Sequence, residues 1–381
     1  MRLPPRILLL LLAGCGAPPP RTETVTLPGT GIKIDMVYVA GRRTVRPFWI
    51  AKHEVTWREF NRFYEFPEEQ RADGITRPSA GKNYLSLSGL PPDFLEPDRP
   101  VTGVRYHSAM AYCEWLSRRT GEIFRLPTET EWEAACVPGS VADEAWSREN
   151  SDERTHAAGG KRADGTGLFD MLGNAWEYCL ESRNPPEFEP VLRGGAWNTP
   201  AAQVGPTLRI SAPADWSLAD PSRPFSLWWF RSDFSQGFRV VRVARSPVRP
   251  SDGSAVEVTA VTGQEHSVKV GGSAAFYSRV TGKVRNRGDR PLDELLLKVF
   301  YLDPAGKPHL EDVAAGQNRR ATYAYAAPVL VNSAHAGDHA RPLKPGESRP
   351  FSVDVPFSFD DPGNVQPAGF GASVLHLVFN D

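Results

Sequence analysis

The chain has 381 residues, of which 40% are hydrophobic and 23% charged, and its formal net charge at pH 7 is −1. A chain this long exceeds one ordinary hydrophobic core, so we expect two domains. The balanced charge argues against a polyanionic ligand, and we expect no nucleic-acid partner. The 35 prolines and 33 glycines favour short elements joined by many turns.

Residues 1–15 have the layout of an export signal peptide. Arg2 and Arg6 precede a short apolar run that ends in Leu-Ala-Gly-Cys at Cys15. The run is too short to span a bilayer as a helix. Its last four residues resemble the lipobox of bacterial lipoproteins, so we predict that Cys15 is acylated and becomes the new N-terminus. The alternative is an ordinary signal peptide with a chance cysteine.

The residues after Cys15 predict where the chain is held. Gly16 stands at the position where an aspartate would, by resemblance to sorting signals, retain the protein at the inner membrane. We therefore expect an exported protein anchored in the outer membrane of a diderm bacterium, with the lipid bilayer as a partner through its acyl chains. Residues 16–28 include Pro18 to Pro20 and are predicted to form a stiff tether.

Two helices are predicted from the same start signal. Thr56 is followed three residues later by Glu59, and Thr128 is followed by Glu131. This spacing is a capping box, in which each side chain satisfies a backbone N–H of the other residue. A third helix, within residues 107–121, is expected to begin with Ser108 as its N-cap and to stop at Gly121.

The stretch "GLFDMLGNAWEYC", residues 167–179, carries polar residues within an apolar run. Asp170, Asn174 and Glu177 lie among large hydrophobic side chains, and Gly173 allows a sharp reversal next to Asn174. One interpretation is a metal site built from carboxylate and carbonyl oxygens. The other is a tight turn, free of metal, whose polar groups bond to backbone amides.

The pattern of the chain changes near residue 246. Residues 246–255 combine proline, aspartate, glycine and serine, as a linker does. Beyond them, segments such as Leu295 to Tyr301 alternate apolar and polar residues and are separated by turn sequences. We predict an α+β domain over residues 29–245 and an all-β sandwich over residues 256–381.

Six sequence blocks of the first domain lie at residues 48–63, 99–117, 125–135, 167–179, 192–197 and 237–242. In this order they resemble the formylglycine-generating-enzyme, or sulfatase-modifying-factor, family. This resemblance implies a variant of the C-type lectin fold. The C-terminal region is similar, more weakly, to small immunoglobulin-like envelope domains.

The family resemblance implies a calcium site in residues 167–179. Carried over by position, Asp170 and Glu177 supply carboxylate oxygens, and Gly173 and Ala175 supply main-chain carbonyls. Hard oxygen ligands of this kind suit calcium rather than a soft metal. The metal-free turn remains the alternative.

The same resemblance argues against copper chemistry. Oxidase members hold a copper ion with two cysteines after the "RGG(S/A)W" block, and those positions are Thr199 and Val204 here. Neither side chain replaces a thiolate, so we expect no copper and assign no catalytic residue. The remaining Cys113, Cys136 and Cys179 allow at most one internal disulfide, which the sequence cannot assign.

Two functional hypotheses follow. The first is a membrane-tethered envelope lipoprotein whose sulfatase-modifying-factor domain is non-catalytic and recognises a protein or glycan, or serves as a scaffold of an envelope assembly. The alternative is an enzyme that modifies an exported protein with groups other than the lost copper ligands. A second cluster of titratable residues in the binding cleft would favour the enzyme.

Overall fold

The computed structural model describes most of the two predicted domains. The predicted signal peptide with Cys15, residues 16–20 of the tether and residues 246–254 of the linker lie outside the described residues. Within the described ranges, no helix is long and apolar enough to cross a membrane. The described residues are 21–41, 45–64, 92–180, 191–211, 234–243, 255–270, 273–302, 306, 327–333, 341–357 and 369–379.

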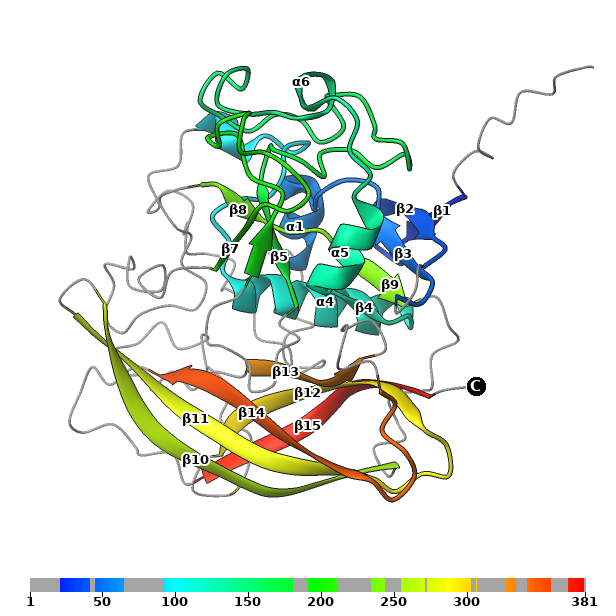
Figure 1. Ribbon diagram of the computed structural model, residues 1–381, viewed down its shortest axis with the longest axis vertical. Helices are drawn as coiled ribbons and strands as arrows, with labels where there is room; N and C mark the ends of the chain where they lie inside the picture. Colours follow the sequence, from blue (N-terminus) through cyan, green and yellow to red (C-terminus); the bar gives the residue numbers. More distant parts are fainter. Residues whose placement is uncertain are drawn as a thin grey trace, which may run out of the picture.

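The first region, residues 21–243, combines two small sheets with short helices (Figure 1). One sheet has the strand order β1-β2-β3-β9-β4, and the other has the order β7-β6-β5-β8. The strands are β1 (Thr22–Thr26), β2 (Lys33–Val39), β3 (Phe48–Ala51), β4 (Phe124–Arg125), β5 (Trp176–Cys179), β6 (Val191–Arg193), β7 (Arg209–Ser211), β8 (Gln236–Gly237) and β9 (Val241–Val243). The helices are α1 (Trp57–Tyr64), the 3-10 helix η1 (Pro92–Leu95), α4 (Tyr106–Thr120), α5 (Glu129–Ala135) and α6 (Val141–Glu144).

Both predicted capping boxes are present. At α1, the Thr56 N–H donates to Glu59 Oε2 at 2.7 Å, and the Glu59 N–H returns a 3.4 Å bond to Thr56 Oγ1. At α5, Thr128 and Glu131 form the same reciprocal pair at 2.8 and 3.2 Å. These contacts satisfy N–H groups that the first turn of a helix otherwise leaves without partners.

The predicted start of α4 is wrong, whereas its predicted end is confirmed. Arg105 is extended, with ψ 156°, and its carbonyl accepts from the Ala109 N–H at 3.1 Å, so the helix starts at Tyr106. Ser108 is therefore buried inside the first turn instead of capping it. Gly121 ends the helix in the left-handed region, with φ 74°, which glycine adopts without steric cost.

The second region, residues 255–379, consists of two antiparallel sheets of three strands each, with orders β10-β11-β14 and β13-β12-β15. One of the turn sequences, Lys344 to Gly346, does form a turn, since the Glu347 N–H donates to the Lys344 carbonyl at 2.9 Å. The strands are β10 (Val256–Val270), β11 (Ser273–Asn286), β12 (Leu292–Leu302), β13 (Ala327–Ser333), β14 (Ser348–Phe357) and β15 (Gly369–Phe379).

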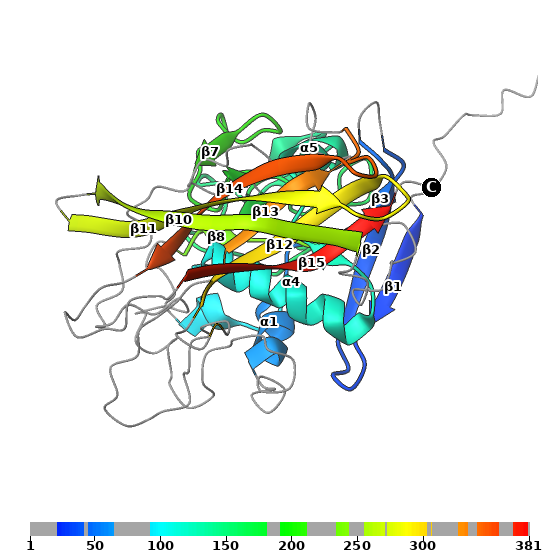
Figure 2. The same cartoon turned by 90° about the horizontal axis from the view of Figure 1, so that it is seen from below.

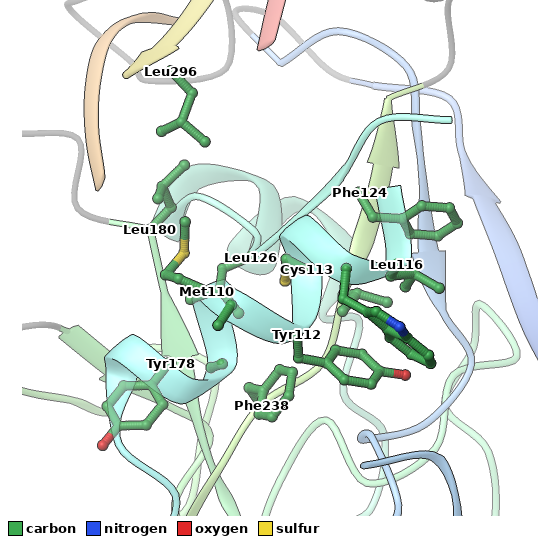
Figure 3. Close-up of a cluster of buried hydrophobic side chains, with 14 of the residues drawn as sticks. Met110, Tyr112, Cys113, Leu116, Phe124, Leu126, Tyr178, Leu180, Phe238 and Leu296 are labelled. Atoms are coloured by element: carbon green, nitrogen blue, oxygen red, sulfur yellow. The ribbon is translucent and has the colours of Figure 1, made fainter. Parts of the chain in front are cut away.

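The two regions share one hydrophobic core. The β13-β12-β15 sheet lies beneath α4, between the first region and the β10-β11-β14 sheet (Figures 1 and 2). Figure 3 shows Leu296 of β12 facing Met110 of α4 and Leu180, and all three belong to one buried cluster. All six side chains of residues 292–297 are buried, because this half of β12 is covered on both faces.

Ion pairs also join the two regions. Arg125 of β4 donates to Glu131 of α5 at 2.6 and 2.9 Å and to Glu294 of β12 at 2.6 and 2.9 Å. All three side chains are at most 2% exposed. Nearer the surface, Lys298 of β12 pairs with Glu114 of α4 at 3.0 Å. The second region is therefore packed against the first through both apolar and charged contacts.

Candidate functional site

The predicted turn lies between α6 and β5 and has an unusual backbone. Asp170, Gly173 and Asn174 all have positive φ, at 53°, 77° and 56°. A Cβ added at Gly173 would overlap the carbonyl of Trp146, so only glycine fits this position. The turn leads directly into β5, so its polar side chains are placed against the buried centre of the first region.

Glu177 on β5 is paired with an arginine that the sequence analysis did not single out. Because β5 and β8 pair in parallel, with Glu177 opposite Gly237, Arg239 lies close to Glu177. Arg239 Nε lies 2.8 and 2.7 Å from the two carboxylate oxygens, and Nη2 donates to Oε1 at 2.6 Å. The indole Nε1 of Trp132 donates to Oε2 at 2.7 Å. Both oxygens of Glu177 are therefore engaged, and its charge is balanced.

Arg239 is itself fully engaged. Its Nη1 donates to the Ala51 carbonyl at 3.1 Å and its Nη2 to the Phe169 carbonyl at 2.9 Å. Burial lowers the pKa of this guanidinium, but the charge and hydrogen bonds of Glu177 outweigh that effect, and the net pKa is raised. Arg239 stays charged and holds the turn against β3.

Asp170 is buried but only half satisfied. Its Oδ2 accepts from the Gly159 N–H at 2.6 Å, whereas its Oδ1 has no hydrogen-bond partner among the described residues. Its side chain is 2% exposed. Burial raises the pKa of Asp170 to about 6, against the lowering effects of the Gly159 bond and the Arg239 charge.

Glu54 is a further buried carboxylate beside the Asp170 turn, and the sequence analysis missed it. The Val55 N–H donates to the Phe238 carbonyl at 2.9 Å, which fixes the segment after β3 beside Arg239. Glu54 is fully buried. Its Oε2 accepts a long 3.4 Å bond from Asn174 Nδ2, and its Oε1 has no hydrogen-bond partner in the described part of the chain. Burial, and then the charge of Asp170, raise the pKa of Glu54 well above its ordinary value.

The structure places the predicted calcium ligands Asp170, Gly173 and Ala175 in the turn and Glu177 on β5, and the two carboxylates differ. The free oxygen of Asp170 fits a cation, because nothing else compensates its burial. Glu177 does not fit, because Arg239 and Trp132 occupy both of its oxygens. Among the described residues, no group of three or more His, Cys, Asp or Glu side chains could hold a metal.

The metal-free alternative also describes the turn only in part. Asp170 does bond to a backbone amide, that of Gly159. Glu177 instead bonds to side chains from α5 and from the segment after β8. The turn therefore depends on residues far away in the sequence for its charge balance.

Thr199 and Val204, the positions where oxidase members are expected to carry cysteine, have packing roles. The Thr199 hydroxyl accepts from the Ala196 N–H at 3.0 Å, and its carbonyl accepts from the Arg148 N–H at 2.9 Å. Val204 is buried in a hydrophobic cluster with Trp132. Neither residue presents a metal ligand of the kind that Cu(I) binds.

The three cysteines in the described residues are free and buried. Burial raises the pKa of Cys113 and of Cys179, and it raises that of Cys136 to about 12. A thiol with such a pKa stays protonated near neutral pH, whereas metal binding and nucleophilic attack need the thiolate.

The sequence profile described as "Sulfatase-modifying factor enzyme 1-like domain" matches residues 17–244. This match covers more than half of the chain, so the protein belongs to that family.

The chain is similar to parts of proteins whose names give different activities. "Hercynine oxygenase" of Mycobacterium tuberculosis is 30% identical over 177 residues, which are 37% of this chain and 40% of that protein. "Inactive C-alpha-formylglycine-generating enzyme 2" of Mus musculus is 32% identical over 121 residues, 26% of this chain and 37% of that protein. The chain thus matches less than half the length of each of these two relatives.

Two solved structures are each similar to more than half of the chain. "Treponema denticola variable protein 1" aligns with a TM-score of 0.41 and 19% identity, covering 58% of this chain and 99% of that one. PvdO from Pseudomonas aeruginosa aligns with a TM-score of 0.38 and 22% identity, covering 59% and 92%.

Proposed function

We propose that this protein is a lipid-anchored component of the cell envelope whose sulfatase-modifying-factor domain is non-catalytic. In this proposal the domain recognises an envelope protein or glycan, or serves as a scaffold of an envelope assembly. The observation that carries the proposal is the conversion of Thr199 and Val204 to packing roles. A copper oxidase needs soft thiolate ligands there, and a threonine hydroxyl bonded to the backbone and a buried valine supply none.

The remaining thiols support the same conclusion. Cys113, Cys136 and Cys179 are buried, and their raised pKa values keep them as neutral thiols. A neutral buried thiol behaves as a small hydrophobic side chain. None of the three therefore replaces the reactive thiolates of an oxidase.

The rest of the chain has a role in presenting this domain. Acylation of Cys15 and the tether of residues 16–28 hold it at the outer membrane in our proposal. The two C-terminal sheets form an immunoglobulin-like sandwich that acts as a spacer or second contact surface. The buried contact of Arg125 with Glu294 supports a rigid spacer, because it fixes the second region to the first.

We also propose that calcium binds at the Asp170 turn. Asp170 would supply a carboxylate oxygen, and Gly173 and Ala175 would supply carbonyl oxygens, which are ligands that calcium prefers. A bound ion would cancel charge that the fold otherwise leaves buried beside the hydrophobic core. Its role would be structural.

The non-catalytic proposal is tested with the purified mature protein. We expect it neither to bind Cu(I) stoichiometrically nor to convert a cysteine-containing sulfatase peptide to formylglycine, as measured by mass spectrometry. An active formylglycine-generating enzyme assayed in parallel is the positive control. Formation of the formylglycine product by the wild-type protein would contradict the proposal.

The anchoring is tested by Cys15→Ser. Because Cys15 is the acylation site in the proposal, this variant should leave the membrane fraction after a high-salt wash, whereas the wild type should remain. Cys136→Ser is a control that keeps Cys15. Salt-resistant membrane association of Cys15→Ser would show that the chain is held in another way.

A further inference from the structure

The buried charges around the Asp170 turn do not balance. Three carboxylates, those of Glu54, Asp170 and Glu177, are at most 2% exposed, and one buried guanidinium, that of Arg239, faces them. When all are ionised, the cluster carries a net charge of −2. Burying such an excess is costly unless another cation enters or the carboxylates take up protons.

Arg239 balances the charge of only one carboxylate, that of Glu177. It makes three of its contacts with Glu177 and gives its remaining N–H groups to the carbonyls of Ala51 and Phe169. No hydrogen bond from Arg239 to Glu54 or Asp170 occurs among those of the described residues. The excess charge therefore resides on Glu54 and Asp170.

Glu54 and Asp170 also hold the two unsatisfied atoms of the cluster. We call Glu54 Oε1 and Asp170 Oδ1 the open oxygens, since neither has a hydrogen-bond partner among the described residues. Their other oxygens are occupied, by Asn174 and by the Gly159 N–H. The Phe169 N–H donates to the Lys52 carbonyl at 2.9 Å, which joins the segment that carries Asp170 to the segment that carries Glu54. Buried polar atoms without partners are rare in folded proteins and often mark an unrecorded ion or water.

We propose that Glu54, and not Glu177, is the second carboxylate ligand that joins Asp170 in binding a divalent cation, with the open oxygens as its ligands. This inference rests on the calcium proposal above and changes its ligand set. A divalent cation matches the excess of two negative charges, and hard carboxylate oxygens suit calcium. Glu177 has a different role: it orients Arg239, which fixes the turn to β3.

Neighbouring groups do not replace the cation. Asn174 Nδ2 is 3.4 Å from Glu54 and is also shared with the His156 carbonyl at 3.3 Å, so it is a weak donor. His53 is only part-buried, and its Nδ1 lies 3.0 Å from the carbonyl, not the carboxylate, of Glu54.

The test compares three glutamine variants of the mature protein. Thermal unfolding is followed in excess chelator and in calcium, and affinity is measured with calcium alone by calorimetry and with terbium by tryptophan-sensitised luminescence. Glu54→Gln removes the proposed ligand, and Glu177→Gln removes the ligand predicted from the family. Glu59→Gln is the matched control, because Glu59 is also buried and lies five residues along the chain but bonds to Thr56.

We expect calcium to raise the melting temperature of the wild type and of Glu59→Gln. Glu54→Gln should bind calcium on the order of 10- to 100-fold more weakly, at least the loss seen when a group that supports a metal ligand is removed. In chelator, Glu54→Gln should melt above the wild type, because it removes one of two repelling charges and offers an amide donor to Asp170. A merely structural Glu54 would not give these opposite effects.

Glu177→Gln should melt lower in both conditions, since it leaves Arg239 without its partner, but should keep the calcium-induced increase. If Glu54→Gln binds calcium as tightly as the wild type, the ligand assignment is wrong. If the wild type itself shows no response to calcium, the calcium proposal and this inference both fail, while the non-catalytic function stands. Where Glu177→Gln does not fold, the comparison of Glu54→Gln with Glu59→Gln decides the assignment alone.

Discussion

Among the described residues, the buried clusters around Arg125 and Arg239 have opposite character. Arg125 faces two carboxylates, and all four oxygens of Glu131 and Glu294 accept hydrogen bonds from it. Arg239 faces three carboxylates but binds only Glu177, and the open oxygens of the other two remain. The first cluster is complete and joins two regions of the fold, whereas the second is incomplete and has room for a further cation.

This difference shows why burial of charge does not identify a functional site by itself. Both clusters lie in low-dielectric surroundings, where an unpaired charge costs far more than a paired one contributes. In the Arg125 cluster every carboxylate oxygen of Glu131 and Glu294 accepts a hydrogen bond from the guanidinium, so the cluster needs no further ligand. The candidate site is distinguished by unsatisfied oxygens and not by the number of acidic residues.

Of the variants considered for the two clusters, Arg239→Met should lose the most stability. This change leaves three buried carboxylates with no guanidinium, so we expect a loss of about 3–5 kcal/mol in the free energy of unfolding, measured with urea. Arg242→Met is the control three residues along the chain: Arg242 pairs with the half-exposed Glu23, and its removal should cost about 1 kcal/mol or less. Equal losses in the two variants would contradict the role assigned to Arg239.

Glu294→Gln tests the complete cluster. Arg125 keeps Glu131 but loses charge-assisted bonds to β12, so we expect a loss of about 1.5–3 kcal/mol. All ten tryptophans lie in the first region, so their fluorescence reports on that region alone although the change is in the second. A shared core predicts one transition at lower urea.

The control for Glu294→Gln is Glu257→Gln, which removes an exposed pair with Arg287 and should leave the midpoint almost unchanged. If tryptophan fluorescence does not respond to Glu294→Gln, the two regions unfold separately and the Arg125 cluster does not couple them.

The smallest expected effect concerns thiol labelling. In the wild type, Cys113 and Cys136 should not react with Ellman's reagent at pH 8, because both are buried and their raised pKa values keep the thiols protonated; reactivity of Cys136 requires a pH approaching 12. The Arg125 charge lowers the pKa of Cys113, and the Arg239 charge lowers that of Cys136, although burial outweighs both effects. Arg239→Met removes a charge that lowers the pKa of Cys136, so faster labelling of Cys136 in that variant would report opening of the destabilised core and not a more acidic thiol. Rapid labelling of the wild type would show that the core is open.

Local signals in the sequence predicted local structure well. The capping boxes of Thr56 and Thr128 and the stop at Gly121 are confirmed, because each depends on residues at most four positions apart. The Ser108 prediction is wrong because an N-cap residue must itself have a non-helical backbone, and the residue with that backbone here is Arg105. The family of the first region was also predicted, from blocks that the matching profile covers.

The charge balance of the candidate site could not be predicted in the same way. The sequence indicated the turn with Asp170 and Glu177, but Arg239 lies 62 residues beyond Glu177, and Asn174 lies 120 residues from Glu54. Only the pairing of β5 with β8 brings Arg239 to its partner. Both missed residues lie within blocks that carry the family resemblance, but a block does not reveal which of its charges face each other.

The packing of β12 against the first region has a consequence for how the chain is made. Glu294 follows Arg125 by 169 residues, which a ribosome working at about 5–20 residues per second adds in roughly 8–35 s. During that interval Met110 and Leu180 have no β12 side chain such as Leu296 to cover them. Part of the apolar surface of the nascent first region therefore stays uncovered until the second region has been synthesised and completes the shared core.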